Sequence, residues 1–285
     1  MLQPGEDRRT IAAMGRALGP DMLAAVYALY REEQARHAAA QPVDLPDIAY
    51  GDDPRQRLDL YLPRGDGPAP VILWVHGGGF LRGEKASPDH PYNAHAGRWA
   101  ARNGMIGAVI NYRLAPDHVW PAGGEDVGRA IDWLRAHIGD HGGDPDRIVA
   151  FGTSAGATHV ATHLRLRSAS PGIAGAVLLS GLYGFVPLEE RDTLYYGDPA
   201  LYPARWPREA MIATQTPLLI ACAEHEPARF QQEAIGLLAA RIDAHGQASP
   251  FFYGAGHNHF SLAYHLGTAD TRLSDAVLGF IGDLP

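Results

Sequence analysis

The chain has 285 residues, 46% of them hydrophobic, and its formal net charge at pH 7 is −8. That length suits one large α/β domain with a buried core, or two small domains at most. The acidic balance, without a local run of lysine and arginine, argues against a phosphate-tracking surface and therefore against nucleic acid as a partner.

Cysteine content and hydropathy bear on the compartment. The single cysteine, Cys222, makes an internal disulfide impossible, which fits a reducing compartment. The first ten residues lack the apolar stretch of a secretion signal, and no window approaches the roughly 18 apolar residues of a membrane span. We therefore expect a cytoplasmic protein without a membrane span.

Short apolar runs alternate with helical patterns along most of the chain. Several runs are continuously apolar (VILWV, AVLL, LLIAC), as is typical of strands buried on both faces. Val127, Ile131 and Leu134 recur at helical spacing and predict a helix over residues 123–138. The alternation predicts an α/β fold with a mostly parallel central sheet flanked by helices. The predicted strands span residues 58–62, 71–76, 105–112, 147–152, 175–180, 217–223 and 249–254.

Two segments lie outside this alternation, and we assign them to the same single domain, residues 1–285. Residues 1–46 form an N-terminal helical segment, in which residues 22–38 carry apolar side chains on one helical face. Residues 183–214 follow a predicted strand and are rich in proline, tyrosine and tryptophan. Because long insertions in compact domains are usually functional, we expect these segments to form a small helical cap over the functional site. Peripheral helices are the alternative.

The first chemical motif is Gly152-Thr-Ser154-Ala-Gly156, a match to G-x-S-x-G. A predicted strand precedes it and residues 155–166 predict a helix, which is the strand–turn–helix context that this nucleophile motif requires. The glycines allow a strained turn that would hold the Ser154 hydroxyl above the sheet at a helix N-terminus. The pattern therefore predicts Ser154 as a nucleophile.

The second motif is His76-Gly-Gly-Gly79-Phe80, directly after the strand VILWV. Consecutive glycines present backbone N–H groups with no side chain in the way, as the oxyanion of a tetrahedral intermediate requires. We assign the oxyanion hole to the N–H groups of Gly78, Gly79 and Ala155. A phosphate-binding loop would need a Lys-Ser/Thr ending or a further glycine at nucleotide-fold spacing, and Phe80-Leu-Arg supplies neither.

A general base and an acid are expected later in the chain, because in proteins with this serine motif the triad residues follow one another in the order serine, acid, histidine. His257 and His259 lie in a glycine-containing loop after the last predicted strand, and both are candidates for the base. Glu224 and Glu226 follow the strand at residues 217–223, where a carboxylate would hold the histidine tautomer and stabilise its charged form. Of the two carboxylates we favour Glu226.

Together these motifs resemble a known family. The glycine loop, the Asn111-Tyr-Arg-Leu-Ala-Pro116 segment and the serine motif are similar to α/β-hydrolase-fold esterases of the hormone-sensitive-lipase group. The stretch from Tyr50 to Pro63 and the ending His257-Asn-His259-Phe260 resemble the related carboxylesterase, feruloyl-esterase and kynurenine-formamidase branch even more. The resemblance runs from about Tyr50 to the C-terminus and implies the α/β-hydrolase fold.

The resemblance also assigns roles to the two undecided residues. In that group the histidine before a phenylalanine is the base, which implies His259. The acid is usually an aspartate in a Glu-x-Asp-Pro pattern; here the chain reads Glu224-His-Glu226-Pro227, so that Glu226 falls on the acid position as a departure from the pattern. A second departure is Phe80, where formamidases more often have tryptophan.

These residues predict a serine carboxylesterase that hydrolyses small-molecule esters through an acyl-enzyme, with the triad Ser154, Glu226 and His259. An arylformamidase or other amidase with the same triad is the alternative, and a non-catalytic ligand-binding member of the fold is a remote one. We expect no cofactor and no metal. His159 and His163 have the spacing of a zinc helix, but Val160 stands where a zincin has glutamate. A small-molecule ester is the expected partner, and a homodimer is a common assembly for such proteins.

Overall fold

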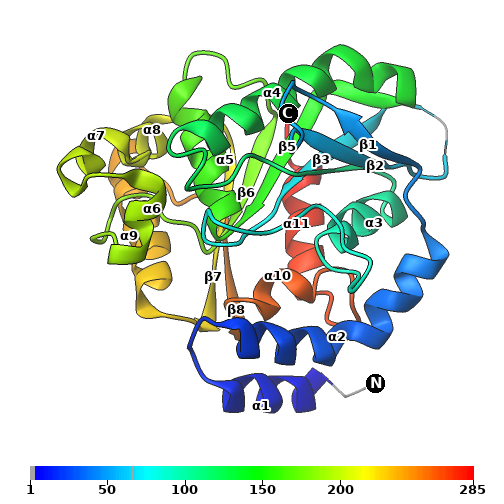
Figure 1. Ribbon diagram of the computed structural model, residues 1–285, viewed down its shortest axis with the longest axis horizontal. Helices are drawn as coiled ribbons and strands as arrows, with labels where there is room; N and C mark the ends of the chain where they lie inside the picture. The colour runs from blue at the N-terminus through cyan, green and yellow to red at the C-terminus, as the bar shows by residue number, and fades with distance from the viewer. Residues whose placement is uncertain (1–3, 66) are drawn as a thin grey trace.

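The computed structural model describes residues 4–65 and 67–285, and its centre is one twisted sheet of eight strands (Figure 1). The strand order is β1-β2-β4-β3-β5-β6-β7-β8. The pairs β1–β2 and β2–β4 are antiparallel, and all other neighbouring strands are parallel. The strands are β1 (Leu45–Ala49), β2 (Arg57–Tyr61), β3 (Ala69–Val75), β4 (Ile106–Ile110), β5 (Gly143–Thr153), β6 (Gly175–Leu179), β7 (Leu218–His225) and β8 (Phe251–Asn258).

The continuously apolar strands are buried on both faces of the sheet, as their sequences predicted. Along β3, Leu73 packs into the core on one face and Trp74 into the core on the other. The first face is covered by α4 (Ala122–His137), α5 (Ala155–Leu166), α8 (Arg208–Ala213) and α9 (Ala228–His245). The second face is covered by α2 (Pro20–Ala40), α3 (Ala94–Arg102), α10 (Ser261–Tyr264) and α11 (Arg272–Gly282). The predicted mostly parallel sheet with flanking helices is confirmed.

The N-terminal segment contains two helices, α1 (Pro4–Met14) and α2, followed by β1. Figure 1 shows both helices beside β8 and α10, at the edge of the molecule opposite β1 and β2. The strand β1 was not predicted, because its five residues LPDIA include a proline and an aspartate and show no regular alternation of burial. It adds an antiparallel edge to the sheet through its pairing with β2.

The segment between β6 and β7 is tied to helix α9 by two buried charged residues. Glu233 is fully buried, and its carboxylate accepts hydrogen bonds from four consecutive backbone N–H groups, those of residues 183–186, at 2.8–3.2 Å. Arg229 pairs with Asp192 at 2.6 Å and with Glu189 at 2.7 Å. The short helices of this segment are η2 (Glu190–Asp192), α6 (Thr193–Tyr196), η3 (Pro199–Leu201) and α7 (Tyr202–Arg205), followed by α8. Another short helix, η1 (Ile138–His141), follows α4.

Among the helices that the structure describes, none is long and apolar enough to cross a membrane.

The interior holds an unusual number of neutral histidines. His76, His95, His163 and His265 are buried, and one ring nitrogen of each lies 2.7–3.0 Å from a backbone carbonyl to which it donates. Among the described residues, the other ring nitrogen of each has no hydrogen-bond partner, and the same is true of Nε2 in buried His159. Protonation would leave an unpaired charged N–H in the core. Burial accordingly lowers the pKa to about 4 for His76, His95 and His163, to about 3 for His159, and well below the ordinary value for His265.

These five histidines predict a protein that loses stability in mild acid. Below a pH of about 6.5 the unfolded chain protonates them and the folded chain does not, so the unfolded state binds more protons and stability falls as pH falls. Each histidine lowers the free energy of unfolding by about 1.4 kcal/mol per pH unit until its folded pKa is reached. In urea unfolding, the slope from these five groups should rise from about two or three protons per molecule at pH 6.5 to between about four and five at pH 5.

His163→Gln supplies the control for this slope, because a glutamine amide can still donate to the carbonyl of Pro171 while it removes one titrating group. The variant should reduce the slope by about one proton. Stability that stays flat between pH 6.5 and 5 would contradict the neutral buried histidines.

Candidate active site

Ser154 lies at the sharp turn where β5 ends at Thr153 and α5 begins at Ala155. Its backbone has φ 53° and ψ −122°, a strained region for a residue with a side chain. The flanking glycines are required by close contacts: a Cβ at Gly156 would lie 2.0 Å from the carbonyl oxygen of Val75, and one at Gly152 would lie 2.6 Å from the backbone of Ala157. The strand–turn–helix context that the motif predicted is therefore present.

Two further side chains complete a continuous hydrogen-bonded chain with Ser154. His259 Nε2 lies 2.9 Å from Ser154 Oγ, and His259 Nδ1 lies 2.9 Å from Glu226 Oε2. Glu226 is fully buried, and its second oxygen accepts a hydrogen bond from the N–H of Ala223 at 2.8 Å. This contact fixes the carboxylate, which in turn fixes the imidazole with its Nδ1–H toward Glu226 and its Nε2 toward the serine.

The two rival residues are engaged elsewhere. Glu224 accepts a hydrogen bond from the N–H of Gly256 at 2.7 Å and thus braces the loop that carries the histidines. His257 is buried against Arg272, whose guanidinium lies 2.9 Å from His257 Nε2, and its ring stacks on His265. The structure therefore brings Glu226 and His259 to Ser154 and leaves Glu224 and His257 in supporting positions.

The glycine loop after β3 lies directly beside Ser154. A Cβ at Gly77 would be 3.2 Å from the Cβ of Ser154, which shows how closely the loop approaches the serine. Gly78 and Gly79 have φ values of 136° and 61°, and Phe80 follows at 69°. Buried His76 lies 2.7 Å from the carbonyl oxygen of Gly77 and, being neutral, donates its Nδ1–H there. The loop thus places its glycine backbone against the serine, as the motif predicted.

A cavity of about 490 Å³ opens above Ser154. The glycine loop and Ala155 form its floor, and His259, Phe260 and Phe230 form the side next to the histidine. Part of the remaining wall comes from the two segments that lay outside the predicted alternation, and part from residues such as His90, Asn93 and Tyr264. Leu18, Gly19, Leu23 and Tyr27 belong to the N-terminal segment, and Arg191 and Asp192 belong to residues 183–214.

Other histidines of the described residues also lie close to possible metal-ligand groups. His257, His265 and Asp270 are the one group of at least three His, Cys, Asp or Glu ligand atoms found together within the described residues. Arg272 already pairs with Asp270 at 2.6 Å and contacts His257, so a guanidinium fills the place of a cation. His163 donates to the carbonyl of Pro171, and His159 packs among aromatic rings, so this pair does not face a common ligand.

Comparison with known proteins finds relatives that are named as ester hydrolases. Residues 58–176 match the BD-FAE family model. The probable carboxylic ester hydrolase LipM of Mycobacterium tuberculosis (strain ATCC 25618 / H37Rv) is 33% identical over 65% of this chain and 48% of its own length. Esterase LipQ of the same organism is 28% identical over 87% of this chain and 63% of its own length. The chain spans about half the length, or less, of most of the curated relatives it matches.

Solved structures agree with the sequence relatives. Esterase Est22 superimposes with a TM-score of 0.72 at 18% identity, over 96% of this chain and 97% of Est22. A bacterial heroin esterase superimposes with a TM-score of 0.67 at 23% identity, over 98% of both chains. The chain has the α/β-hydrolase fold. The resemblance to α/β-hydrolase esterases that the motifs indicated is thereby confirmed.

Several residues of this α/β-hydrolase site carried no sequence signal. Phe230 packs its ring 4.2 Å from that of His259, and Arg229 beside it anchors Asp192 at the cavity wall. Both lie in α9, whose sequence shows no motif, and only the packing of α9 against the strand β7 brings them to the site. Tyr27 lies in the predicted N-terminal helix, but nothing in the sequence placed that helix beside α10.

The choice of acid can be tested with a matched pair of variants. Glu226→Gln keeps the shape of the side chain and removes the charge that stabilises the protonated His259, so hydrolytic kcat should fall about 10²- to 10⁴-fold. Glu224→Gln keeps a carbonyl oxygen that can accept from Gly256, and it should cost less than tenfold. Equal losses in the two variants would remove Glu226 from the acid position.

The choice of base is tested in the same way. His259→Ala removes the only imidazole that contacts Ser154 among the described residues, and its kcat should fall about as far as that of a serine variant. His257→Ala should keep far more activity, because its ring contacts Arg272 and Ser261 and not the serine. The reverse ranking in steady-state kinetics would transfer the role to His257.

Proposed function

We propose that this α/β-hydrolase is a serine carboxylesterase that hydrolyses carboxylic esters of small molecules through an acyl-enzyme. The observation that carries the proposal is the unbroken hydrogen-bond chain from Glu226 through His259 to Ser154, which ends in a cavity beside the glycine loop. The names of the sequence relatives LipM and LipQ support ester hydrolysis.

The geometry supports a first half-reaction in which Ser154 attacks the ester carbonyl. His259 Nε2 accepts the hydroxyl proton at 2.9 Å, and buried Glu226 stabilises the resulting imidazolium through Nδ1. The carbonyl oxygen becomes an oxyanion, for which the N–H groups of Gly78, Gly79 and Ala155 are the proposed donors. Collapse of this intermediate breaks the ester C–O bond, and His259 returns the proton to the leaving alcohol.

The second half-reaction uses the same groups with water. His259 removes a proton from water, the hydroxide oxygen attacks the acyl carbonyl, and the same donors hold the second oxyanion. Breakage of the acyl–Ser154 bond releases the carboxylic acid, and the proton on His259 returns to Ser154 Oγ. The triad, the backbone N–H donors, the ester and water account for every proton and bond in the two half-reactions.

The proposed function also includes two chain segments that cover the cavity. Residues 1–46 and 183–214 both contribute cavity walls, and α9 ties the second of them through Glu233 and Arg229. A volume of about 490 Å³ lies in the range of small-molecule pockets. We propose that the two segments act as a helical cap, which limits substrates to molecules that fit beneath it.

The test is a panel of aryl and alkyl esters with the wild type and Ser154→Ala. The wild type should hydrolyse esters and be labelled by a fluorophosphonate at Ser154, whereas kcat of Ser154→Ala should fall about 10⁴-fold with unchanged folding. A mutant that keeps more than a tenth of the wild-type rate would contradict the assignment of the nucleophile. Circular dichroism of the two proteins controls for folding.

Rival functions give different results in the same assays. Faster turnover of an N-formyl aniline than of the matched aryl ester would favour an arylformamidase or related amidase. A folded wild type that is neither labelled nor active on any ester would favour a ligand-binding protein.

A further inference from the structure

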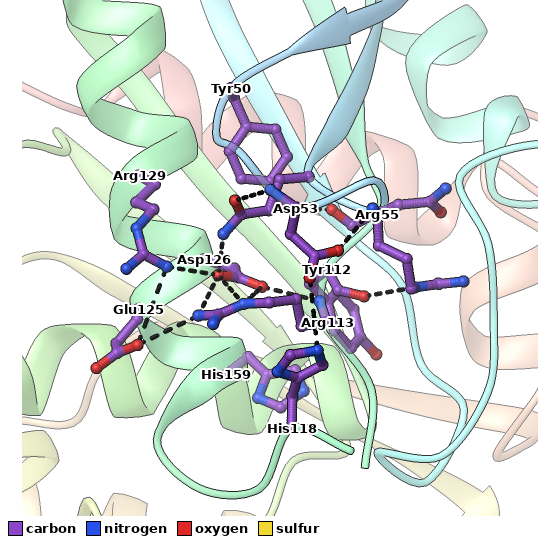
Figure 2. A network of polar contacts seen from close by, with 12 residues as sticks. Tyr50, Asp53, Arg55, Tyr112, Arg113, His118, Glu125, Asp126, Arg129 and His159 are labelled. Carbon is purple, nitrogen blue, oxygen red and sulfur yellow. Dashed lines mark hydrogen bonds and ion pairs between the residues drawn. The ribbon is translucent and has the colours of Figure 1, made fainter. Parts of the chain in front are cut away.

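A network of polar side chains connects segments next to the glycine loop, and none of the residues labelled in Figure 2 lines the cavity. Its members come from the turn between β1 and β2, from residues 111–116 after β4, and from the start of α4. Residues 111–116 belong to the segment that resembles the esterase family, and they have no role in the proposed mechanism. Arg55 in the turn contacts Gly83, and Tyr112 contacts His76, so these two residues reach the two ends of the loop formed by residues 76–83.

The guanidinium of Arg55 joins two separate backbone segments. Its Nε donates to the carbonyl oxygen of Tyr112 at 2.8 Å, and its terminal NH2 group donates to the carbonyl oxygen of Gly83 at 2.7 Å. Figure 2 shows this side chain extended toward Tyr112. A planar fork with fixed donor directions suits two carbonyls held at a set separation, and a lysine ammonium lacks that geometry.

Tyr112 holds the opposite end of the same loop. Its hydroxyl donates to the carbonyl oxygen of His76 at 2.8 Å, and its ring stacks on the imidazole of His76 with centroids 4.3 Å apart. The loop is therefore fixed at His76 by Tyr112 and at Gly83 by Arg55, and Arg55 also holds the backbone of Tyr112. Arg55 is therefore connected to both ends of the loop, directly at Gly83 and through the backbone of Tyr112 at His76.

The loop between these two points needs external support. Three successive residues, Gly78, Gly79 and Phe80, have positive φ, and glycine loses more conformational freedom on ordering than any other residue. Within the loop, the carbonyl of Phe80 accepts a hydrogen bond from the N–H of Ala115 at 3.0 Å, again from the segment after β4. The backbone of the loop is thus held by Arg55, Tyr112 and the segment after β4, and the ring of Phe80 also stacks on Tyr195.

The segment after β4 is in turn fixed by Asp126 of α4. This fully buried carboxylate accepts hydrogen bonds from Gln56 at 2.7 Å, from the backbone and side chain of Arg113 at 2.8–3.0 Å, and from Arg129 at 3.0 Å. Figure 2 shows Asp126 with Arg113 and Arg129 directed toward it. Gln56 follows Arg55 directly, so the same carboxylate holds the turn that carries Arg55.

We infer that Arg55 is a positioning residue for the oxyanion hole. It does not touch the reacting atoms, because residues 77–84 line the cavity and Arg55 does not. By fixing Gly83 relative to Tyr112, its guanidinium sets where the N–H groups of Gly78 and Gly79 lie relative to Ser154. The inference rests on the proposed acyl-transfer function, since it concerns the donors for that oxyanion.

The chain offers a matched control two residues away. Arg57 is half-buried like Arg55, and its guanidinium donates only to carbonyls of the same turn, those of Gly51, Asp53 and Gln56. Arg57→Met removes an arginine from this turn and leaves the contacts to Tyr112 and Gly83 in place. General loosening of the turn should therefore affect both variants, and misplacement of the glycine loop only the Arg55 variants.

The experiment compares wild type, Arg55→Met, Arg55→Lys and Arg57→Met in fluorophosphonate labelling of Ser154 and in ester turnover. Arg55→Met should lower the labelling rate constant and kcat about 10- to 100-fold with KM within twofold, since small displacements of catalytic donors cost rates of this order. Arg55→Lys should fall between Arg55→Met and wild type, and Arg57→Met should stay within twofold of wild type.

Inhibitor binding separates positioning from a merely structural role. The Ki of a trifluoromethyl ketone, which forms an oxyanion with the serine, should rise in Arg55→Met by the factor lost in kcat/KM. The Ki of the product alcohol, which needs no oxyanion donor, should stay unchanged. Equal increases for both inhibitors, or equal losses in Arg55→Met and Arg57→Met, would overturn the inference.

Failure of Arg55→Met to fold and failure of the proposed function can both be distinguished from failure of the positioning role. If Arg55→Met does not fold, Arg55→Lys carries the test, and a trifluoromethyl ketone Ki equal to that of wild type would overturn the inference. A folded wild type that is neither labelled nor active would refute the proposed function itself. Because labelling does not depend on the ester chosen, an unsuitable substrate cannot imitate failure of the positioning role.

Discussion

The strained turn at Ser154 is the constraint on which the rest of the site depends. A residue with a side chain is held at positive φ there, at a cost on the order of 1–3 kcal/mol, and packing on every side must hold it. Gly156 allows α5 to approach the carbonyl of Val75 at the end of β3, and the N–H of Ser154 bonds the carbonyl of Leu179 at the end of β6. The serine is thus fixed between its two neighbouring strands.

The same position determines which segments can reach the serine. The loops after β3, β7 and β8 leave the sheet at the carboxyl ends of parallel strands, where β5 also ends, so the glycine loop, Glu226 and His259 meet Ser154 from the ends of three other strands. The order of the strands places the acid and the base on one side of the serine and the oxyanion loop on the other. Buried Glu226 supplies charge only where His259 can use it, because the N–H of Ala223 fixes its second oxygen.

Polar groups away from the reacting atoms hold the walls of the cavity. On one side, Glu233 and Arg229 of α9 fix residues 183–192. The carboxylate of Glu233 accepts hydrogen bonds from four consecutive backbone N–H groups, which would otherwise lack these partners. On the other side, the network around Arg55 and Asp126 fixes the glycine loop. Each network satisfies irregular backbone that has no partner within a helix or the sheet, and each leaves its loop free to face the cavity.

Local patterns were enough to predict the central sheet, the helices α4 and α5 beside it and the serine turn. Buried parallel strands need continuous apolar runs, and a helical face needs apolar residues at helical spacing, so the strands around β3 and the helix α4 are legible in the sequence alone. The motif around Ser154 and the glycine loop is equally local, because tight turns and close backbone approach require glycine at fixed positions. The short strand β1 was not predicted, because five residues that include proline have no periodicity of their own.

Only the tertiary structure decided which groups meet. Between His257 and His259, two residues apart on one loop, the sequence offered no physical criterion. The folded loop directs His259 toward Ser154 and buries His257 against Arg272, fifteen residues later in the chain. The same holds for Arg55 and Gly83, whose contact crosses 28 positions. Motifs and periodicity record what each segment requires of its own backbone, whereas contacts between distant segments depend on how the layers pack, and a single sequence does not encode that in any local pattern.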